Sequence, residues 1–398
     1  MALTPVEDAL AILLADANAP LRHEPIALDA AFGRILAVDI YSAIDVPPAD
    51  NSAMDGYAVR AADVVSGKSL RVSQRITAGT VGAPLEPGTA ARIFTGAEIP
   101  PGADAVVMQE NCRQIDAEIL VGVAPQIGEN VRPRGQDIRA GNLLVASGSR
   151  LNAADVALLA SVGLARVSVF PQLVVTIFST GDELVEPGQP LLPGQIYNSN
   201  RPLLTGLLRE LGCVVRDLGI VRDTAADTAD ILRRAVSNSD CVISTGGVSA
   251  GEEDHVREQL EKLGALKLWK LNIKPGKPLA YGRLQNTPFF GLPGNPVSAF
   301  VTFIILVKPF LQQLQGGHRA AVKPHYLPAA FTWDKPGNRQ EYLRARIVVD
   351  AAQRKVVELF PNQSSGALTS VAWANALVVI APQQTVQCDD RVAVIPLE

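Results

Sequence analysis

The sequence predicts a multidomain protein of the α/β plus β class, and three observations lead to this fold class. The chain has 398 residues, more than one hydrophobic core normally holds, so several domains are expected. Between residues 171 and 316, apolar strand-like runs alternate with helical segments, which is typical of a doubly wound parallel sheet with helices on both faces. Residues 46–137 and 317–398 instead carry short strand-like runs between Gly and Pro clusters, which indicates smaller β-rich domains.

The remaining segments, residues 1–45 and 138–170, each contain a predicted helix. We therefore expect a discontinuous helical N-terminal domain, with the β-rich residues 46–137 inserted between its two parts. The last segment, residues 317–398, is expected to form a small β-barrel or sandwich.

Each of the two predicted N-terminal helices has a recognisable start. In the first, Thr4 and Glu7 have the spacing of a capping box, and Pro5 suits the first helical position. In the second, Asn152 is the expected cap and Asp155 follows three residues later. Both starts predict well-defined helix boundaries.

Charge and residue usage exclude several protein classes. Lys and Arg number 36 against 40 Asp and Glu, a net charge of −4, which argues against a general nucleic-acid binder. A small anionic substrate stays possible, because a few local cations suffice for it. The histidines lack zinc-site spacing, and the widely separated cysteines are expected to be reduced: Cys112, Cys213, Cys241 and Cys388.

Two features of the sequence bear on localisation. No run of 18 apolar residues is present, so we predict no membrane-spanning helix. Glu7 and Asp8 lie where a secretory signal peptide would be uncharged. A cytoplasmic protein is therefore expected.

The chemistry is expected at the carboxyl ends of the strands between residues 171 and 316, where open α/β sheets bind ligands. Four loops there combine glycine with hydroxyl or charged residues: STGDEL (179–184), TGGVSAGEED (245–254), KPGKP (274–278) and PGNPVS (293–298).

Three of these loops suit an anion. TGGVSAGEED joins a strand to a helix and can either bind a phosphate or oxyanion or form an ordinary tight turn. In KPGKP, Lys274 and Lys277 place two cations on a turn stiffened by prolines, where lysine can hold a phosphate or oxyanion. In PGNPVS, Asn295 is expected to cap a helix that begins with Pro296, and its backbone amides can also bind an anion.

Several carboxylates lie beside glycine or in predicted loops. They are Asp55, Asp137, Asp182, Glu183 and Asp223. A single Asp beside Gly is most often a turn residue. Several acids that face several cations would suit Mg²⁺ together with a polyanion.

Seven motifs of this sequence occur together in one known family. They are SAMDGYA (52–58), PPGADAVV (100–107), GENVRPRGQDI (128–138), STGDEL, TGGVSAG with Asp254, KPGKP and GLPGNPVSAF (291–300). In this order the chain resembles the molybdopterin molybdenumtransferase family, the MoeA type that also includes the E domain of gephyrin. The resemblance covers nearly the whole chain. It implies four domains: a helical one, an inserted β-rich one, a molybdopterin-binding α/β domain and a C-terminal β-barrel.

The resemblance also implies an activity, the final step of molybdenum cofactor biosynthesis. Enzymes of this family take adenylylated molybdopterin and molybdate and use Mg²⁺ to help cleave the phosphoanhydride. AMP leaves, and the metal is inserted at the dithiolene. Two anionic substrates must then be held close together, and the local cations would bind them.

By motif match, the resemblance assigns roles to individual residues. Lys274 and Lys277 would hold molybdate or phosphate, closed over by Arg344 (in EYLR) and Ser365 (in NQSSG). Thr245, Gly246 and Gly247 would cradle the pterin-side phosphate. The other implied substrate-binding residues are Thr95, Ser249, Pro293, Asn295 and Ser298. The implied catalytic residues are Asp55, Asp137, Glu183 and Asp223, and the implied metal contacts are Asp223 and Asp254.

The family also implies a homodimer in which the inserted domain of one subunit reaches the α/β domain of the other. Asp55, Thr95 and Asp137 would then act in trans. One motif departs from the family, which usually has Gln-Gly-Ser where this chain has Gln363 followed by two serines, so either Ser364 or Ser365 can face the oxyanion.

The sequence leaves open two other functions, adenylylation of molybdopterin and non-catalytic pterin binding, and the choice between molybdate and tungstate. Molybdopterin adenylyltransferases share the α/β domain, but the additional segments here favour the molybdenumtransferase. A non-catalytic pterin-binding scaffold would be expected to lose its acids and lysines, which this chain keeps. Molybdate and tungstate are tetrahedral dianions of nearly equal size, so the sequence allows both.

Overall fold

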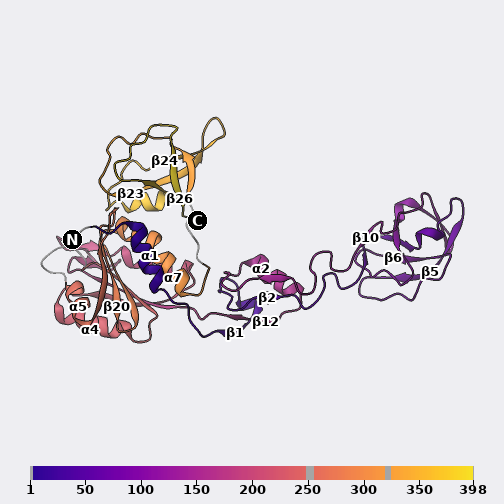
Figure 1. Ribbon diagram of the computed structural model, residues 1–398, viewed down its shortest axis with the longest axis horizontal. Helices are drawn as coiled ribbons and strands as arrows, with labels where there is room; N and C mark the ends of the chain where they lie inside the picture. Colours follow the sequence, from indigo (N-terminus) through magenta and orange to yellow (C-terminus); the bar gives the residue numbers. More distant parts are fainter. Residues whose placement is uncertain (1–2, 248–254, 319–323, 398) are drawn as a thin grey trace. The chain divides into compact units, whose positions relative to one another are not determined.

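The computed structural model describes residues 3–247, 255–318 and 324–397. The chain divides into two compact units, which are described separately below (Figure 1). Unit 1 contains residues 1–24, 33–37 and 169–398, and unit 2 contains residues 25–32 and 38–168.

The centre of unit 1 is a six-stranded sheet with the strand order β16-β13-β17-β21-β20-β18. The bounds of its strands are Val174–Thr180 for β13, Val214–Val221 for β16, Cys241–Thr245 for β17, Gly264–Lys270 for β18, Pro278–Leu284 for β20 and Thr287–Leu292 for β21. Strands β16, β13, β17 and β21 are parallel, as predicted. Strand β20 pairs antiparallel with both β21 and β18, so the prediction of a fully parallel sheet was wrong at this edge.

The antiparallel edge has a local cause. Only Gln285 and Asn286 separate β20 from β21, and Gln285 has a φ of 57°. A two-residue connection makes a hairpin, because a parallel crossover needs a much longer segment.

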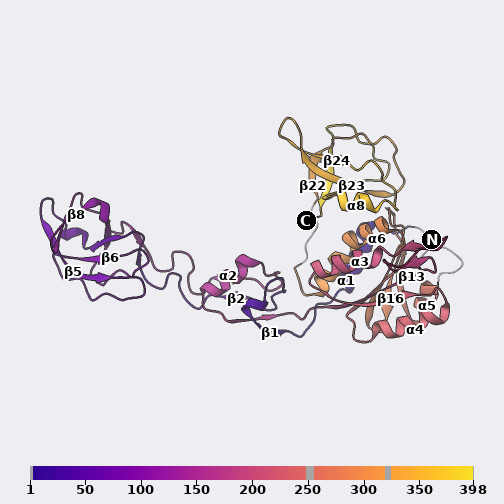
Figure 2. The same ribbon diagram turned by 180° about the vertical axis from the view of Figure 1, so that it is seen from behind.

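Helices cover both faces of this sheet, as expected for a doubly wound fold (Figure 2). One core cluster joins one sheet face to α1 (Val6–Asp16), α3 (Asn200–Glu210), α6 (Pro296–Thr302) and α7 (Lys308–Leu314). The other face packs against α4 (Ala225–Val236) and α5 (His255–Leu263).

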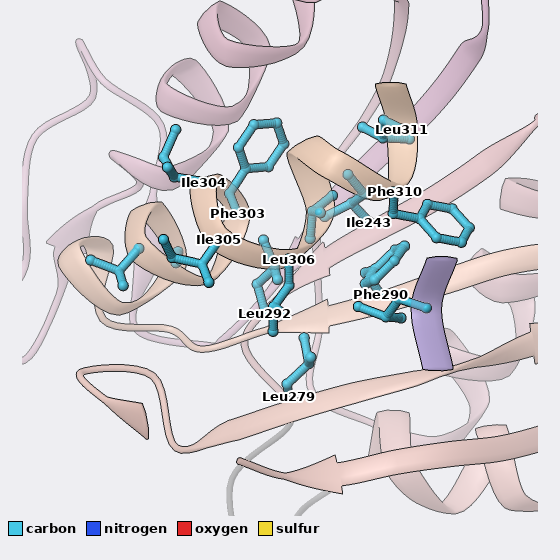
Figure 3. Packing of buried hydrophobic residues seen from close by; sticks show 14 of the residues in the cluster. Ile243, Leu279, Phe290, Leu292, Phe303, Ile304, Ile305, Leu306, Phe310 and Leu311 are labelled. Carbon is cyan, nitrogen blue, oxygen red and sulfur yellow. The ribbon is translucent and has the colours of Figure 1, made fainter. Parts of the chain in front are cut away.

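Between α6 and α7 the helical path contains a π-helical segment, η4 (Phe303–Val307). Pro309 lies just beyond it and lacks the N–H that would continue a regular α-helical ladder, which explains the widened turn. Figure 3 shows Leu306 and Phe310 projecting toward the strand residues Leu292 and Phe290. The rings of Phe290 and Phe310 meet edge to face with centroids 5.0 Å apart.

This helical stretch, Pro296–Leu314, is also long and apolar enough to cross a membrane by length and composition. In the fold, however, 78% of it is buried. Its apolar side chains are therefore explained by the core, as in the central helix of a globular protein.

The first helix corrects the predicted domain boundary. Residues 1–24 belong to unit 1, not to a helical domain shared with residues 138–170. Ala9 and Leu13 are fully buried in the core of unit 1, and Gln313 donates to the carbonyls of Leu14 and Ala17 at the end of the helix.

An ion cluster holds the same helix end. Burial alone would raise the pKa of Asp16, but hydrogen bonds from Tyr281, Lys267 and Arg283 lower it to about 2. The carboxylate lies 2.9 Å from Lys267 Nζ and 3.0 Å from Arg283 Nε. These contacts attach α1 to the antiparallel edge of the sheet.

The predicted capping box of this helix is also wrong. The helix begins at Val6, and its first residue is preceded by Pro5 without a side-chain cap. Thr4 pairs through its backbone instead, donating to Lys270 O at 3.0 Å and accepting from Asn272 N at 2.7 Å. Main-chain pairing with the sheet edge thus takes the place of the cap.

The C-terminal part of unit 1 is a second six-stranded sheet, in the order β19-β23-β25-β26-β22, with β24 beside β23. An isolated bridge between Ala329 and Val357 joins the end of β22 to β24, so the strands curl around one apolar cluster. The bounds are Ile273–Lys274 for β19, His325–Pro328 for β22, Gln340–Val349 for β23, Lys355–Leu359 for β24, Ala376–Ile380 for β25, Arg391–Pro396 for β26 and Leu368–Trp373 for α8. Because β19 comes from the KPGKP segment, this sheet incorporates part of the predicted α/β domain.

Unit 2 contains a six-stranded sheet in the order β7-β4-β6-β5-β9-β8, with its own apolar clusters. The bounds are Gly56–Val59 for β4, Ser69–Ile76 for β5, Thr89–Ile93 for β6, Ala105–Met108 for β7, Cys112–Ile115 for β8 and Glu118–Val121 for β9. These strands all lie within the predicted β-rich segment.

The rest of unit 2 has one α-helix, α2 (Ala153–Ser161), and short strand pairs. Asn152 caps its start as predicted, and the structure shows that Asp155 completes a capping box. The short strands are Ile40–Tyr41 (β2), Asn51–Ser52 (β3), Val131–Arg132 (β10) and Leu143–Val145 (β11). Two further short strands are Glu24–Ala27 (β1) and Arg166–Val169 (β12), which pair with each other.

Unit 1 also contains one short strand pair, Leu184–Val185 (β14) and Ile196–Tyr197 (β15).

Candidate functional site

Two adjoining clefts in unit 1 contain most of the predicted site residues. The first, here called the strand-end cleft, has a volume of about 380 Å³ and lies at the ends of β13, β17 and β21. The second, here called the junction cleft, also has a volume of about 380 Å³ and lies where β19 pairs with β23. Pro278 and Ser298 line both clefts, so a ligand in one lies next to a ligand in the other.

The strand-end cleft is lined by residues from all four predicted loops. The predicted residues found there are Glu183, Thr245, Gly246, Gly247, Pro293, Asn295 and Ser298. This is the arrangement expected for parallel strands, whose carboxyl ends meet at one edge of a sheet. Asn295 precedes α6, and Pro296 is its first residue as predicted, but the Asn295 side chain makes no cap hydrogen bond.

Two glycines let the backbone fold tightly in this cleft. Gly246 has a φ of 86° and Gly247 a φ of 65°, in the left-handed region that favours glycine. A Cβ on Gly246 would lie 2.3 Å from Thr180 O, and a Cβ on Gly247 would lie 2.6 Å from a methyl group of Val256. The amide of Gly246 donates to Leu292 O at 3.2 Å, so it ties two strand ends together.

Buried polar atoms are normally hydrogen-bonded, so one without a partner needs an explanation, such as a ligand that supplies the bond. Two atoms that have no partner among the described residues belong to the strand-end cleft, Thr180 Oγ1 and Asn200 Oδ1. The Asn200 amide is held by Gly294 O at 2.7 Å, which leaves its oxygen for another donor. The hydroxyl of Thr245, by contrast, already lies 2.7 Å from Ser179 Oγ.

The junction cleft contains the predicted Lys274, Lys277, Ser298, Arg344 and Ser365. Gly276 allows the lysine turn to lie against α6, because its φ is 105° and a Cβ there would come within 2.5 Å of Thr302 Oγ1. Arg339, which donates to Ile273 O at 3.0 Å, adds another cation. Four cationic side chains thus line one cleft.

Arg344 is the most unusual of these cations, because its side chain is fully buried. Its guanidinium donates to Ser370 Oγ at 3.0 Å, to Ser364 O at 3.2 Å and to Tyr342 O at 3.4 Å. All three acceptors are neutral, and within the described part of the chain no carboxylate pairs with it. Burial lowers the pKa of Arg344 to about 10, so the group still carries its charge at neutral pH.

The carboxylate in the junction cleft belongs to Glu341, which is 1% exposed. Its Oε1 accepts from Lys274 Nζ at 3.1 Å, across the paired strands β19 and β23. Its Oε2 is buried without a hydrogen-bond partner among the described residues. The indole N–H of Trp333, also lining this cleft, is likewise buried without one.

Both candidate serines lie in the junction cleft. The hydroxyl of Ser364 accepts from Gly366 N at 3.4 Å, and its carbonyl accepts from Arg344. The carbonyl of Ser365 accepts from Val297 N at 3.1 Å, which ties this loop to the start of α6.

The predicted residues of unit 2 form a separate group. The exposed carboxylate of Asp55 accepts from both the backbone N and the Oγ1 of Thr95, each at 2.8 Å. These hydrogen bonds, the backbone one first, hold the pKa of Asp55 below its ordinary value, and nearby Arg92 acts in the same direction. Asp137 is exposed, and its backbone N donates to Val46 O at 3.0 Å.

Three predicted residues are not placed in a cleft. Asp223 lines neither cleft, although its backbone N lies 3.3 Å from Asp182 Oδ1 beside the STGDEL loop. Ser249 and Asp254 lie outside the described residues. In the described ranges, no group of three or more His, Cys, Asp or Glu side chains is arranged to hold a metal ion.

Sequence reasoning missed several residues that line the clefts. They are Thr180 and Asn200 in the strand-end cleft, and Trp333, Arg339, Glu341 and Gln363 in the junction cleft. A signal for Glu341 was present, since it opens the EYLR motif and is a charged residue at the start of an apolar strand.

Three family models match the chain and together span most of it. The MoeA N-terminal region (domain I and II) matches residues 4–163. The probable molybdopterin binding domain matches residues 176–313, and the MoeA C-terminal region (domain IV) matches residues 326–397.

Curated relatives and solved structures agree with these matches. A molybdopterin molybdenumtransferase of Haemophilus influenzae is 40% identical over 381 residues, which cover 95% of this chain and 94% of the relative. A Nostoc protein of the same name is 39% identical, covering 91% of this chain and 86% of the relative. A crystal structure of the molybdopterin biosynthesis MoeA protein from Pyrococcus horikoshii has a TM-score of 0.85 at 29% identity, covering 99% of this chain and 100% of that one.

The contact between Asp55 and Thr95 can be tested by titration. Thr95→Val removes the hydroxyl donor but keeps the backbone donor, so we expect the pKa of Asp55 to move up, part of the way to its ordinary value. Carboxyl carbon chemical shifts followed by NMR against pH measure this. The pKa of Asp63, which is lowered chiefly by the backbone N–H of Gly88, serves as the control and should not move. An unchanged Asp55 pKa would contradict the geometry described here.

Proposed function

Because the chain belongs to the molybdopterin molybdenumtransferase family, an enzyme family of molybdenum cofactor biosynthesis, we propose that its two clefts hold the two substrates. Molybdate occupies the junction cleft, and the phosphate-bearing part of adenylylated molybdopterin occupies the strand-end cleft. The observation that carries this proposal is the buried guanidinium of Arg344, which lines the junction cleft with only neutral partners among the described residues.

The charge of the junction cleft supports an anionic ligand. Lys274, Lys277, Arg339 and Arg344 supply four positive charges, against one negative charge from Glu341. A buried cation is costly unless an opposite charge compensates it. A tetrahedral dianion would supply that charge, and the hydroxyls of Ser298 and Ser365 would donate to its oxygens. The hydroxyl of Ser364 accepts from Gly366 N and keeps its own O–H to donate, so Ser364 stays a candidate beside Ser365.

The strand-end cleft supports a phosphate-bearing substrate. Gly246 and Gly247 let a ligand approach the backbone closely, and Thr180 and Asn200 offer buried polar atoms without a partner in the described ranges. Because Ser298 lines both clefts, the reacting parts of the two substrates would lie side by side. Holding two anions in contact is the main task of the site, since proximity replaces a bimolecular encounter. AMP would then leave as the metal is inserted.

Mg²⁺ is proposed as the cofactor. Magnesium sites commonly use one or two carboxylates together with substrate phosphates, so a three-residue cluster is not required. Glu183, at the strand-end cleft, is the described carboxylate that fits this role, beside the unpartnered Thr180 Oγ1. When bound, the ion would neutralise the phosphoanhydride during cleavage. The predicted metal contact Asp223 lies outside this cleft.

We further propose a homodimer with a shared active site, in which Asp55, Thr95 and Asp137 of unit 2 serve the clefts of the partner's unit 1. The support is that Asp55 and Thr95 form a preorganised polar pair at the surface of unit 2, as active-site groups do. A cytoplasmic location is proposed as well, because all four cysteines are free thiols.

The two other functions suggested by the sequence are less well supported. An adenylyltransferase or a pterin-binding scaffold would have no need for a second cleft with a buried guanidinium. Relatives that match over most of this chain carry the molybdenumtransferase name.

The proposed function is tested by AMP release from adenylylated molybdopterin with Mg²⁺ at increasing molybdate. We expect release to depend on molybdate, and Lys277→Ala to raise the half-maximal molybdate concentration roughly tenfold or more, as for a lost charged hydrogen bond. Lys355→Ala, at the exposed first residue of β24, is the matched control and should behave as wild type. Release that is independent of molybdate, or an unaltered Lys277→Ala variant, would contradict the assignment.

The shared active site is tested by mixing two impaired variants, Asp55→Asn and Lys277→Ala, at a molybdate concentration too low for Lys277→Ala to turn over. If each site combines unit 2 of one subunit with unit 1 of the other, mixed dimers contain one intact site. Random reassortment then restores about a quarter of the wild-type rate. If each subunit supplies its own site, every site carries one substitution and mixing restores nothing. Each variant mixed with itself is the control.

A further inference from the structure

Glu341 is the one described carboxylate in a cleft lined by four cations, and only one of its two oxygens has a hydrogen-bond partner there. Oε1 accepts from Lys274, whereas Oε2 has no partner among the described residues. The loop at Gly337 covers the group closely, since a Cβ there would lie 2.3 Å from Oε1. An ion pair that only joined β19 to β23 would need no second, unpaired oxygen buried at the cleft. The free oxygen therefore indicates a donor that arrives with the ligand.

Molybdate itself offers no such donor. Its oxygens and those of an ionised carboxylate are acceptors only, and two acceptors in one buried site repel each other unless they share a proton. Among the described residues no cation donates to Oε2, because Lys274 binds the other oxygen and Arg339 donates to Ile273 O. In the proposed function the charges of Arg344 and Lys277 are taken up by molybdate, so neither remains to separate molybdate from Oε2.

We propose that Glu341 shares a proton with bound molybdate, so that each molybdate enters the junction cleft together with one proton from solvent. This inference rests on the proposed function, since it takes molybdate to be the ligand of the junction cleft. The proton lies between Oε2 and one molybdate oxygen. Glu341 is thereby a further catalytic residue, because it contacts an atom that leaves during metal insertion.

The chemistry of insertion uses such a proton. Two S–H bonds of the dithiolene break, two Mo–S bonds form, and one molybdate oxygen departs as water, while molybdenum keeps its oxidation state. The departing oxygen takes its first proton from Glu341. One thiol returns a proton to the carboxylate, and the other thiol supplies the second proton of the water. In the net reaction two thiol protons are consumed in forming the water, and the proton that entered with molybdate stays on Glu341 until the product leaves, when it returns to solvent.

The test is isothermal titration of the full-length protein with sodium molybdate in buffers of different ionisation enthalpy. The observed binding enthalpy, plotted against that of the buffer, gives the number of protons taken up. We expect about one proton for each molybdate bound, and an affinity that weakens about tenfold for each pH unit above neutrality. Binding by the wild type without proton uptake would overturn the inference and leave the proposed function standing. Absence of any molybdate binding would instead overturn the proposed function, and this inference with it.

Glu341→Gln identifies the group that holds the proton. Gln keeps an oxygen to accept from Lys274 and supplies its own N–H to molybdate, so the variant should bind molybdate with no proton uptake. Glu358→Gln, on the neighbouring strand β24 and outside the cleft, is the matched control and should keep the uptake. Uptake that persists in Glu341→Gln would overturn the assignment. Should that variant fail to fold, the wild-type titration still decides.

Discussion

A guanidinium that is removed from water must be compensated, and Arg344 shows how this requirement shapes the site. Its guanidinium donates to Ser370, Ser364 and Tyr342, but these acceptors carry no charge. Full compensation needs an anion, and the described part of the chain places no carboxylate beside the group. The positive charge is thus kept for a ligand. The pairing of β19 with β23 makes this possible, because it brings the two lysines of KPGKP to the strand that carries Arg344.

The rest of unit 1 positions a second anion beside the first. Three parallel strands end at the strand-end cleft, and two glycines in the left-handed region allow the backbone to turn tightly there. Helix α6 connects the two clefts, because Ser298 lines both and the amide of Val297 holds the loop of Ser365. The buried helical stretch behind α6 packs on the sheet through residues such as Phe310, which fixes the position of α6. Core packing and site geometry are therefore linked through one helix.

The sequence predicted the features that depend on local chemistry or on general rules of sheet topology. The cap that Asn152 forms is local, and the clustering of loops at the strand ends follows from parallel topology. Features that depend on distant pairing were not accessible. Thr4 pairs with the sheet edge instead of capping its helix, and α1 packs into unit 1 because its apolar face completes that core. Glu341 was missed for the same reason, since its importance arises only when β23 lies beside β19. Most residue assignments came through the resemblance to a family, and spacing alone would not have brought Lys274 and Arg344 into one cleft.

The central claim is that the buried charge of Arg344 is compensated by an oxyanion, and anomalous diffraction tests it most directly. Crystals of the full-length protein would be soaked in molybdate and measured at the molybdenum absorption edge. The account predicts an anomalous peak in the junction cleft, with molybdate oxygens within hydrogen-bonding distance of the Arg344 guanidinium. A peak confined to the strand-end cleft, with the guanidinium still bonded only to its neutral partners, would contradict it.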